Sequence, residues 1–358
     1  MFAIRLMISS RRRAASASSY WSSGWSVMSA RMVRTYQENK PLIIGCCIYC
    51  GATEYFPGSK EPPHLEHVIP EAINGTILLG EASCRACERR INPWETKLLK
   101  GALLGCRTYL KLDTKRPKDR PSSLPLFDTQ VEPNQKHQIP LIDYPASLLL
   151  PLLGAPGEHR YTNSLSQTNG AWIRFFNNNL EVIKNKYGLS ETATANLDFY
   201  AFCRILAKIA HGFAVLSLGM NGFIPILPNF IMGKHDIHML HYVGGYSEIP
   251  PASANLHEIG IEDPTDRTWK HIVVTVRLFA QFGAPVYRII AGDRINPKPP
   301  LGVLLAQASV LRNSQKNFSE NPTSHPIPVG LWDPNVPSSS SIPVPNFQRW
   351  IRANMKVT

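Results

Sequence analysis

The stretch from Leu65 to Cys87, LEHVIPEAINGTILLGEASCRAC, holds a histidine-bearing apolar run, an Asn-Gly turn and a pair of cysteines. The runs EHVIP and TILL flank Asn74 and Gly75, and this pattern predicts a strand, a turn and a second strand. The segment CERRINPWETKLLKGALL, which begins at the last of these cysteines, predicts a helix. The expected local topology is therefore ββα.

A second cysteine pair lies upstream of this stretch. Cys47 and Cys50 form a C-x-x-C pair, and 33 residues separate it from the pair at the end of the opening stretch. Zinc binds four thiolates tetrahedrally, and two C-x-x-C turns present their sulfurs at a suitable separation. Four unrelated buried thiols are the alternative, and Cys46 competes with Cys47, although Cys47 has the tighter spacing. The predicted structural zinc ligands are Cys47, Cys50, Cys84 and Cys87.

Cysteine usage and charge indicate the setting of this site. The chain has seven cysteines, an odd number, and two C-x-x-C pairs are typical of a metal site in a reducing compartment. Residues 1–45 hold seven Arg or Lys against one Glu, and residues 97–120 hold eight against two Asp, so these two segments account for the net charge of +12. Basic segments attract phosphate by Coulomb attraction and counterion release, which favours nucleic acid over a merely solvated surface.

The elements from residue 42 to residue 105 resemble a known family. A C-x-x-C pair, an acidic residue followed by His, a hydrophobic residue and Pro, a Gly-containing turn and a second C-x-x-C occur in that order. This order resembles the HNH endonucleases of the ββα-metal type, and most closely their zinc-containing subgroup. The resemblance implies an enzyme that hydrolyses DNA phosphodiester bonds, with zinc as a structural ion and Mg²⁺ or Mn²⁺ as the catalytic ion.

The same resemblance assigns roles to individual residues. It implies that His67 is the general base that takes a proton from the attacking water, and that Glu66 holds the catalytic ion. The second ligand of that ion is expected on the helix, where Glu88 replaces the usual Asn or His and Asn92, one turn further along, is the competing ligand. Asn74 is the approximate match to the Asn that orients the histidine.

Other functions are compatible with these residues. The changed ligand positions also suit a non-catalytic zinc module that binds nucleic acid, and a protein-interaction adaptor is a third possibility. His64 is interpreted as incidental, and the three histidines of HDIHMLH, His235, His238 and His241, as structural.

The length of 358 residues predicts two domains, and the expected fold class is α+β. In the second domain, NLDFYAFCRILAKIAHGFAVLSLG predicts a largely buried helix with three polar residues on one face, for which a solvated face or a contact within that domain is expected. The run WKHIVVTVRLFAQFGAPVYRIIAG predicts a β-hairpin around FGAP. The predicted units are a basic extension (1–41), an HNH-like zinc domain (42–105), a Pro-rich linker (106–145), an α+β domain (146–318) and a Pro/Ser-rich tail (319–358).

The N-terminus bears on location. The first 37 residues hold six Arg and no acid, which is the composition of an organelle transit peptide. A disordered or wrongly assigned extension, with the true start at Met28 or Met32, is the alternative. No apolar run is long enough to predict a membrane span. We expect a cytoplasmic protein with no membrane partner, with a mitochondrial location as the alternative.

Overall fold

The computed structural model describes part of the chain, and the fold is given for that part alone. The described residues are 3–5, 41–112, 114, 117–127, 136–157, 168–177, 179–189, 194–234, 239–246, 248–262, 270–295, 305–308 and 327–328. Most of the predicted N-terminal extension and tail, together with His235 and His238, lies outside these residues. Both helices and sheets are present, which confirms the α+β fold class.

The predicted strand, turn, strand and helix occur in that order in the region of the cysteines. Strand β3 pairs antiparallel with β4, β2 pairs parallel with the other side of β4, and helix α1 follows β4 directly. A short 3-10 helix, η1, lies in the connection between β3 and β4. The bounds are β2 (Leu42–Ile43), β3 (His64–His67), η1 (Glu71–Ile73), β4 (Leu78–Ser83), α1 (Arg85–Lys100) and α2 (Leu104–Tyr109).

The Asn-Gly turn has a steric reason. Asn74 ends η1 in the left-handed conformation, with φ of 63°, which Asn adopts more readily than most residues. A Cβ atom at Gly75 would lie 1.9 Å from the carbonyl oxygen of Ile69, so only glycine fits there. The turn returns the chain so that Val68 N–H donates to the carbonyl of Ile77 across the hairpin.

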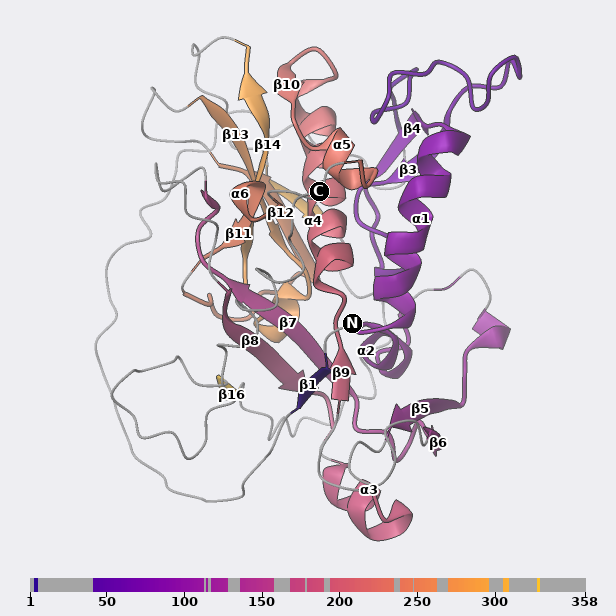
Figure 1. Ribbon diagram of the computed structural model, residues 1–358, viewed down its shortest axis with the longest axis vertical. Coiled ribbons are helices and arrows are strands. Elements are labelled where there is room, and N and C mark those ends of the chain that lie inside the picture. The colour runs from indigo at the N-terminus through magenta and orange to yellow at the C-terminus, as the bar shows by residue number, and fades with distance from the viewer. Residues whose placement is uncertain are drawn as a thin grey trace, which may run out of the picture.

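Helix α4 (Phe199–Leu218) runs through the middle of the protein (Figure 1). Its N-terminus is capped by Asp198, whose side chain accepts a hydrogen bond from Ala201 N–H at 2.8 Å. By length and composition this helix is apolar enough to cross a membrane, but 89% of the relevant window is buried inside the protein. Such burial is typical of the core helix of a folded domain, which agrees with the prediction of a buried helix.

One face of α4 packs on a six-stranded antiparallel sheet, and another packs on α1 (Figure 1). The predicted hairpin is confirmed, because β13 and β14 pair antiparallel around the 3-10 helix η4. The sheet has the order β10-β14-β13-β12-β15, with β11 also paired to β14. The bounds are β10 (Phe223–Pro225), β11 (Val243–Gly245), β12 (His257–Ile261), β13 (His271–Arg277), η4 (Ala280–Phe282), β14 (Tyr287–Arg294) and β15 (Leu305–Ala308).

Smaller elements complete the described fold. β7 pairs with β8 and β8 with β16, while β5 pairs with β6 inside the segment predicted as a linker, and β1 pairs with β9. The bounds are β1 (Ala3–Arg5), η2 (Pro117–Asp119), β5 (Ser123–Phe127), β6 (Lys136–Pro140), β7 (Ser147–Leu153), β8 (Thr168–Phe175), α3 (Leu180–Tyr187), β9 (Thr194–Asn196), α5 (Pro228–Ile231), α6 (Met239–Tyr242) and β16 (Ile327–Pro328).

The segment 42–105, which we call the zinc region after the ion predicted for its cysteines, shares one apolar core with the region that follows residue 146. A single cluster of buried side chains includes Ile48, Leu79 and Ile91 from the former and Phe202 and Phe213 from the latter. The predicted boundary near residue 105 remains a prediction. Its two sides are packed together rather than joined by a linker alone.

Two buried histidines bond across this shared core. The Nε2 atom of His211 lies 2.7 Å from the carbonyl oxygen of Ile48, and that of His257 lies 2.6 Å from the carbonyl oxygen of Ile73. Phe279 N–H donates to His257 Nδ1 at 3.0 Å, so the His257 ring is neutral with its proton on Nε2. Burial lowers the pKa of both histidines to about 4.

Because these two histidines are buried and neutral, we expect the protein to lose stability in mild acid. An unfolded histidine has a pKa of about 6.5, so below that pH the unfolded chain binds more protons than the folded chain. Stability therefore decreases as the pH is lowered. From the pKa of about 4, we expect the free energy of unfolding to fall by about 2 kcal/mol per histidine between pH 8 and pH 5. Urea unfolding of the wild type and of His257→Gln, which keeps a donor for Ile73, measures this. An equal pH dependence in both proteins would contradict the prediction.

Candidate metal centre

The four predicted zinc ligands lie together. Their Sγ atoms are all within 4.8 Å of one another, and Cys50 Sγ is 3.6 Å from Cys84 Sγ. A tetrahedral zinc ion with Zn–S distances of about 2.3 Å requires sulfurs about 3.8 Å apart, so the group fits such an ion. Cys46 is not a member of the group, which favours Cys47 as the ligand. The four cysteines are therefore placed to hold a metal ion such as zinc.

Backbone hydrogen bonds hold the two cysteine turns side by side. Gly51 N–H donates to the carbonyl of Cys47 at 2.8 Å, which closes the first turn, and Cys84 is the N-cap of α1. Ile48 N–H donates to the carbonyl of Ala82 at 2.9 Å and joins the first turn to the end of β4. The end of β4 thus sets the position of both pairs.

The surroundings of the sulfur atoms shift the pKa values of two of the thiols in opposite directions. A side-chain hydrogen bond from Cys87, the largest cause, lowers the pKa of Cys47 to about 5 and raises the pKa of Cys87. One thiolate is thus favoured even without an ion, and a metal cation favours thiolates at the other positions. Cys87 also lies 3.5 Å from the sulfur of Met232, so the centre contacts the chain just after α5.

Glu66, predicted to hold the catalytic ion, is buried against α4. Its Oε1 atom is 2.6 Å from Nζ of Lys208, whose side chain is 4% exposed. The same Nζ lies 2.5 Å from Oε1 of Glu95 and donates to the carbonyl of His67 at 3.1 Å. Burial raises the pKa of Glu66, against the lowering effect of the Lys208 charge. As arranged, Glu66 is neutralised by an ammonium group and does not fit a divalent ion while Lys208 stays there.

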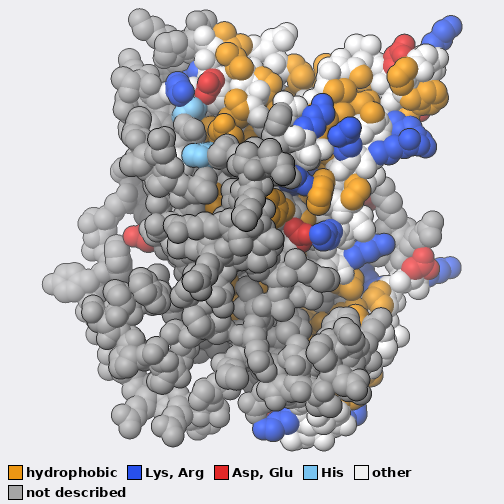
Figure 2. Space-filling model, in the orientation of Figure 1, with side chains coloured by type: hydrophobic (Ala, Val, Ile, Leu, Met, Phe, Trp, Pro, Cys, Tyr) orange, Lys and Arg blue, Asp and Glu red, His pale blue; other side chains and the backbone are white. Residues whose placement is uncertain are grey.

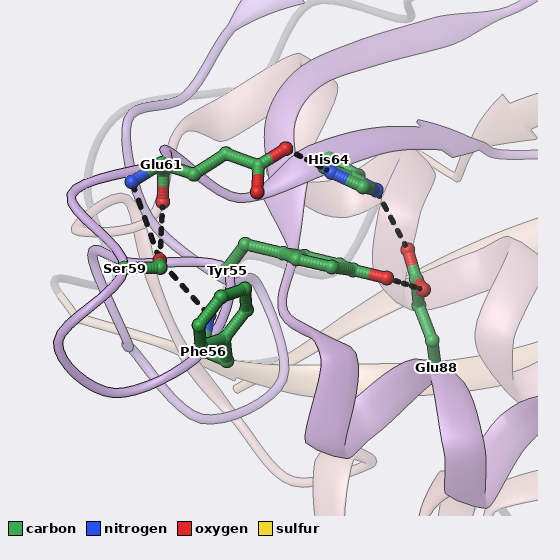
Figure 3. Close-up of polar contacts among 6 residues, drawn as sticks. All are labelled: Tyr55, Phe56, Ser59, Glu61, His64 and Glu88. Carbon is green, nitrogen blue, oxygen red and sulfur yellow. Dashed lines mark hydrogen bonds and ion pairs between the residues drawn. The ribbon is translucent and has the colours of Figure 1, made fainter.

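Glu88, the predicted second ligand, has a different set of partners. Its Oε2 atom accepts a hydrogen bond from the Tyr55 hydroxyl at 2.9 Å, and its Oε1 atom lies 3.9 Å from Nδ1 of His64 (Figure 3). The His64 ring stacks on Tyr55, with centroids 3.5 Å apart, and its Nε2 atom lies 2.8 Å from Glu61 Oε1. The structure therefore pairs Glu88 with His64, a histidine to which the sequence assigned no role.

The other predicted site residues lie nearer the surface. His67 ends β3 with its side chain 26% exposed, and its Nε2 atom is 3.8 Å from Oε2 of Glu71. Asn74 is at the turn after η1, and Asn92 is exposed on α1. Glu66 and His67 are thus adjacent in sequence but differ in exposure, as expected for neighbours on a strand.

An exposed basic face lies on α1. Figure 2 shows Lys and Arg side chains gathered on the side of the molecule that α1 occupies. Lys97 pairs with Asp198, the N-cap of α4. The other exposed basic residues of the helix are Arg85, Arg89, Arg90 and Lys100. Such a face attracts phosphate groups.

No family model, curated protein or solved structure matches the chain.

Proposed function

We propose that the chain is a zinc-stabilised nuclease of the HNH type that hydrolyses DNA phosphodiester bonds, with His67 as the general base. The position of His67 supports this proposal best. The histidine ends the strand that leads into the ββα order, its imidazole reaches solvent, and Glu71 lies beside it. A nearby carboxylate orients an imidazole and stabilises the imidazolium that forms when it accepts a proton.

The reaction follows from these groups. A ring nitrogen of His67 takes a proton from water, the resulting hydroxide attacks the phosphorus atom, and the bond from phosphorus to the leaving oxygen breaks. The leaving oxygen receives a proton from solvent. The basic face of α1 holds the phosphate backbone by charge, and its exposed arginines also donate hydrogen bonds to phosphate oxygens.

Replacement of His67 is expected to abolish most cleavage. His67→Ala removes the proton acceptor, and the loss of a general base costs about 100-fold or more in rate. The measurement is nicking of supercoiled plasmid in the presence of Mg²⁺ or Mn²⁺, with zinc quantified on the same samples and an EDTA control. His137→Ala, a histidine on β6, is the control and should cleave like the wild type. Equal rates for wild type and His67→Ala would contradict this role for His67.

A second candidate is a zinc module that binds nucleic acid without cleaving it. The ion pair of Glu66 with Lys208, and the engagement of Glu88 by Tyr55, favour it. One zinc per chain together with DNA binding that weakens as salt rises, and no cleavage with any cation, would support this candidate. An affinity that is insensitive to salt would count against both candidates and in favour of a protein partner.

A further inference from the structure

The loop between the first cysteine turn and β3 presents an aromatic side chain to solvent. In this loop, which spans residues 51–63, Phe56 is 46% exposed and the next residue, Pro57, is exposed as well. The loop projects beside the N-terminal end of α1 (Figure 1). A single exposed phenylalanine is ordinary on a protein surface, so its rigidity and its neighbours decide whether it has a function.

Hydrogen bonds fix the tip of this loop. Ser59 N–H donates to the carbonyl of Phe56 at 3.0 Å, which closes a four-residue turn with Pro57 at its second position. Gly58 has a φ of 80°, as the third position of a type II turn requires, and its N–H donates to Glu54 Oε2 at 2.8 Å. The Phe56 side chain is therefore carried by an ordered turn, so a ligand that binds it loses little affinity to ordering of the loop.

The neighbouring tyrosine anchors the loop to α1. Tyr55 is buried, its hydroxyl donates to Glu88 Oε2 at 2.9 Å, and its ring stacks on His64. The Phe56 ring lies outside this stack and points away from Glu88 (Figure 3). It meets the Tyr55 ring at 67°, with centroids 6.1 Å apart. Tyr55 thus fixes the loop to the helix, while much of the Phe56 ring stays accessible to a partner.

Basic side chains lie next to the loop. Arg85 N–H donates to the carbonyl of Tyr55 at 2.8 Å, and the Arg85 guanidinium carbon lies 6.0 Å from the centre of the Tyr55 ring. Arg89, one turn further along α1, is also exposed. The carboxylate of Glu61 is engaged by His64, with Oε1 2.8 Å from Nε2. Figure 2 shows hydrophobic and basic side chains next to one another on this side of the molecule. An exposed ring beside arginines is complementary to a nucleic acid strand, which offers base faces between phosphates.

The energetics favour an unpaired base as the ligand of the ring. Stacking of one base on an aromatic side chain strengthens binding by about 5-fold to 150-fold. Opening a stacked step of a duplex to admit the ring weakens binding by a factor of similar size, about 100-fold. The two effects largely cancel in a paired duplex, whereas a base that is already unpaired offers its face without that cost.

We propose that the loop at Phe56 is a binding site for an unpaired base of DNA. The Phe56 ring stacks on the base, and Arg85 and Arg89 hold the neighbouring phosphates. This inference rests on the proposed function for DNA as the partner, and it adds the kind of DNA, which is DNA with unpaired bases. It concerns binding, so it does not depend on proton transfer by His67.

The test compares two fluorescein-labelled duplexes, one fully paired and one with a short unpaired bubble at its centre. Binding to the zinc-loaded full chain is followed by fluorescence anisotropy in buffer without Mg²⁺ or Mn²⁺. We expect the wild type to bind the bubble more tightly than the paired duplex. Phe56→Ala should weaken binding to the bubble about tenfold and leave binding to the paired duplex unchanged. Ile142→Ala, which shortens another exposed apolar side chain, is the matched control and should bind both DNAs like the wild type.

Two further variants identify stacking as the cause. Phe56→Trp keeps an aromatic face and should keep the preference for the bubble, whereas Phe56→Leu keeps an apolar side chain without such a face and should lose the preference. Phe56→Ala should leave the salt dependence of binding unchanged, because a neutral ring releases no counterions. Arg89→Ala should weaken binding to both DNAs and reduce the salt slope by about one.

Zinc content and circular dichroism confirm on each sample that the protein is folded. Equal affinity of the wild type and Phe56→Ala for the bubble overturns the inference, and so does an equal loss of affinity for both DNAs. If the wild type binds neither DNA, the partner in the proposed function is wrong and the inference fails with it. Plasmid nicking with Mg²⁺ is measured separately. A preference for the bubble that depends on Phe56, without nicking, supports this site and contradicts only the nuclease.

Discussion

Replacement of Cys84 by Ser is expected to unfold the zinc region and to take the shared core with it. Zinc contributes roughly 10–16 kcal/mol of apparent binding free energy in small zinc domains at neutral pH, which is as large as the roughly 5–15 kcal/mol that holds a typical domain folded. Cys84 supplies one of the four sulfurs and is also the N-cap of α1. Its loss therefore removes the tetrahedral set, whereas the start of the helix is not weakened, because Cys84 makes no side-chain cap bond and serine is a favoured N-cap residue.

The effect extends beyond the zinc region because buried groups cross the shared core. Ile48, within the first cysteine turn, accepts the hydrogen bond of His211 from α4, and Cys87 contacts Met232. Once the turns open, these contacts lose their partners, and a buried polar group without a partner costs about 1–3 kcal/mol. We thus expect lower helix content at 25 °C and no cooperative urea transition.

Circular dichroism, urea unfolding and zinc analysis check this expectation. Cys46→Ser is the matched control, because Cys46 is one residue from Cys47 and lies outside the four-sulfur group. It should keep one zinc per chain and change the free energy of unfolding by less than about 1 kcal/mol. A folded Cys84→Ser protein without zinc, with the wild-type urea midpoint, would show that the metal is dispensable for the fold.

The part of the fold that was predicted correctly depends on local sequence patterns. The order of strand, turn, strand and helix depends on neighbours in the chain: the apolar runs, the Asn74-Gly75 turn and the cysteine spacing. The hairpin of β13 and β14 is likewise read from alternation and a glycine turn. Such signals are present in a short window, so sequence alone suffices for them.

The sequence could not identify the partners of the buried charged side chains, and the reason is physical. Lys208 lies 113 residues from Glu95 and 141 residues from His67 along the chain, so no local pattern connects them. The polar face of α4 was expected to be solvated or to bond within its own domain, and it instead meets the zinc region. A buried lysine needs an opposite charge, so its place on an apolar helix signalled a partner without identifying it.

The pairing of Glu88 shows a second limit. The family pattern placed Glu88 as a metal ligand, and position on the helix cannot show which way a side chain turns. In the structure the Tyr55 hydroxyl donates a hydrogen bond to the Glu88 carboxylate, and the His64 ring lies beside the same carboxylate. The rings of Tyr55 and His64, nine residues apart in the chain, stack on each other. A bulge in β3 between His64 and Glu66 also interrupts the alternation of side-chain directions along the strand. The direction of the His64 side chain could therefore not be inferred from that alternation.

Replacement of Lys208 by Met is expected to lower stability strongly. Removal of one partner from a buried ion pair costs about 3–5 kcal/mol, because the remaining charge is left buried and uncompensated. Here two carboxylates would be left without the ammonium group. Burial alone lowers the pKa of Lys208, but the charges of Glu66 and Glu95 outweigh burial and raise it, so the lysine is charged in the folded protein.

The double variant Lys208→Met with Glu66→Gln separates charge from packing. With one carboxylate neutralised, this double variant should recover part of the lost free energy of unfolding, measured by urea at pH 7.5 on zinc-loaded protein in buffer with no chelator and no other divalent ion. Lys100→Met, an exposed lysine on α1, is the control and should change stability by less than about 0.5 kcal/mol. If Lys208→Met matches the wild type in stability and Glu66→Gln adds nothing, the ion pair is not what joins α4 to the zinc region.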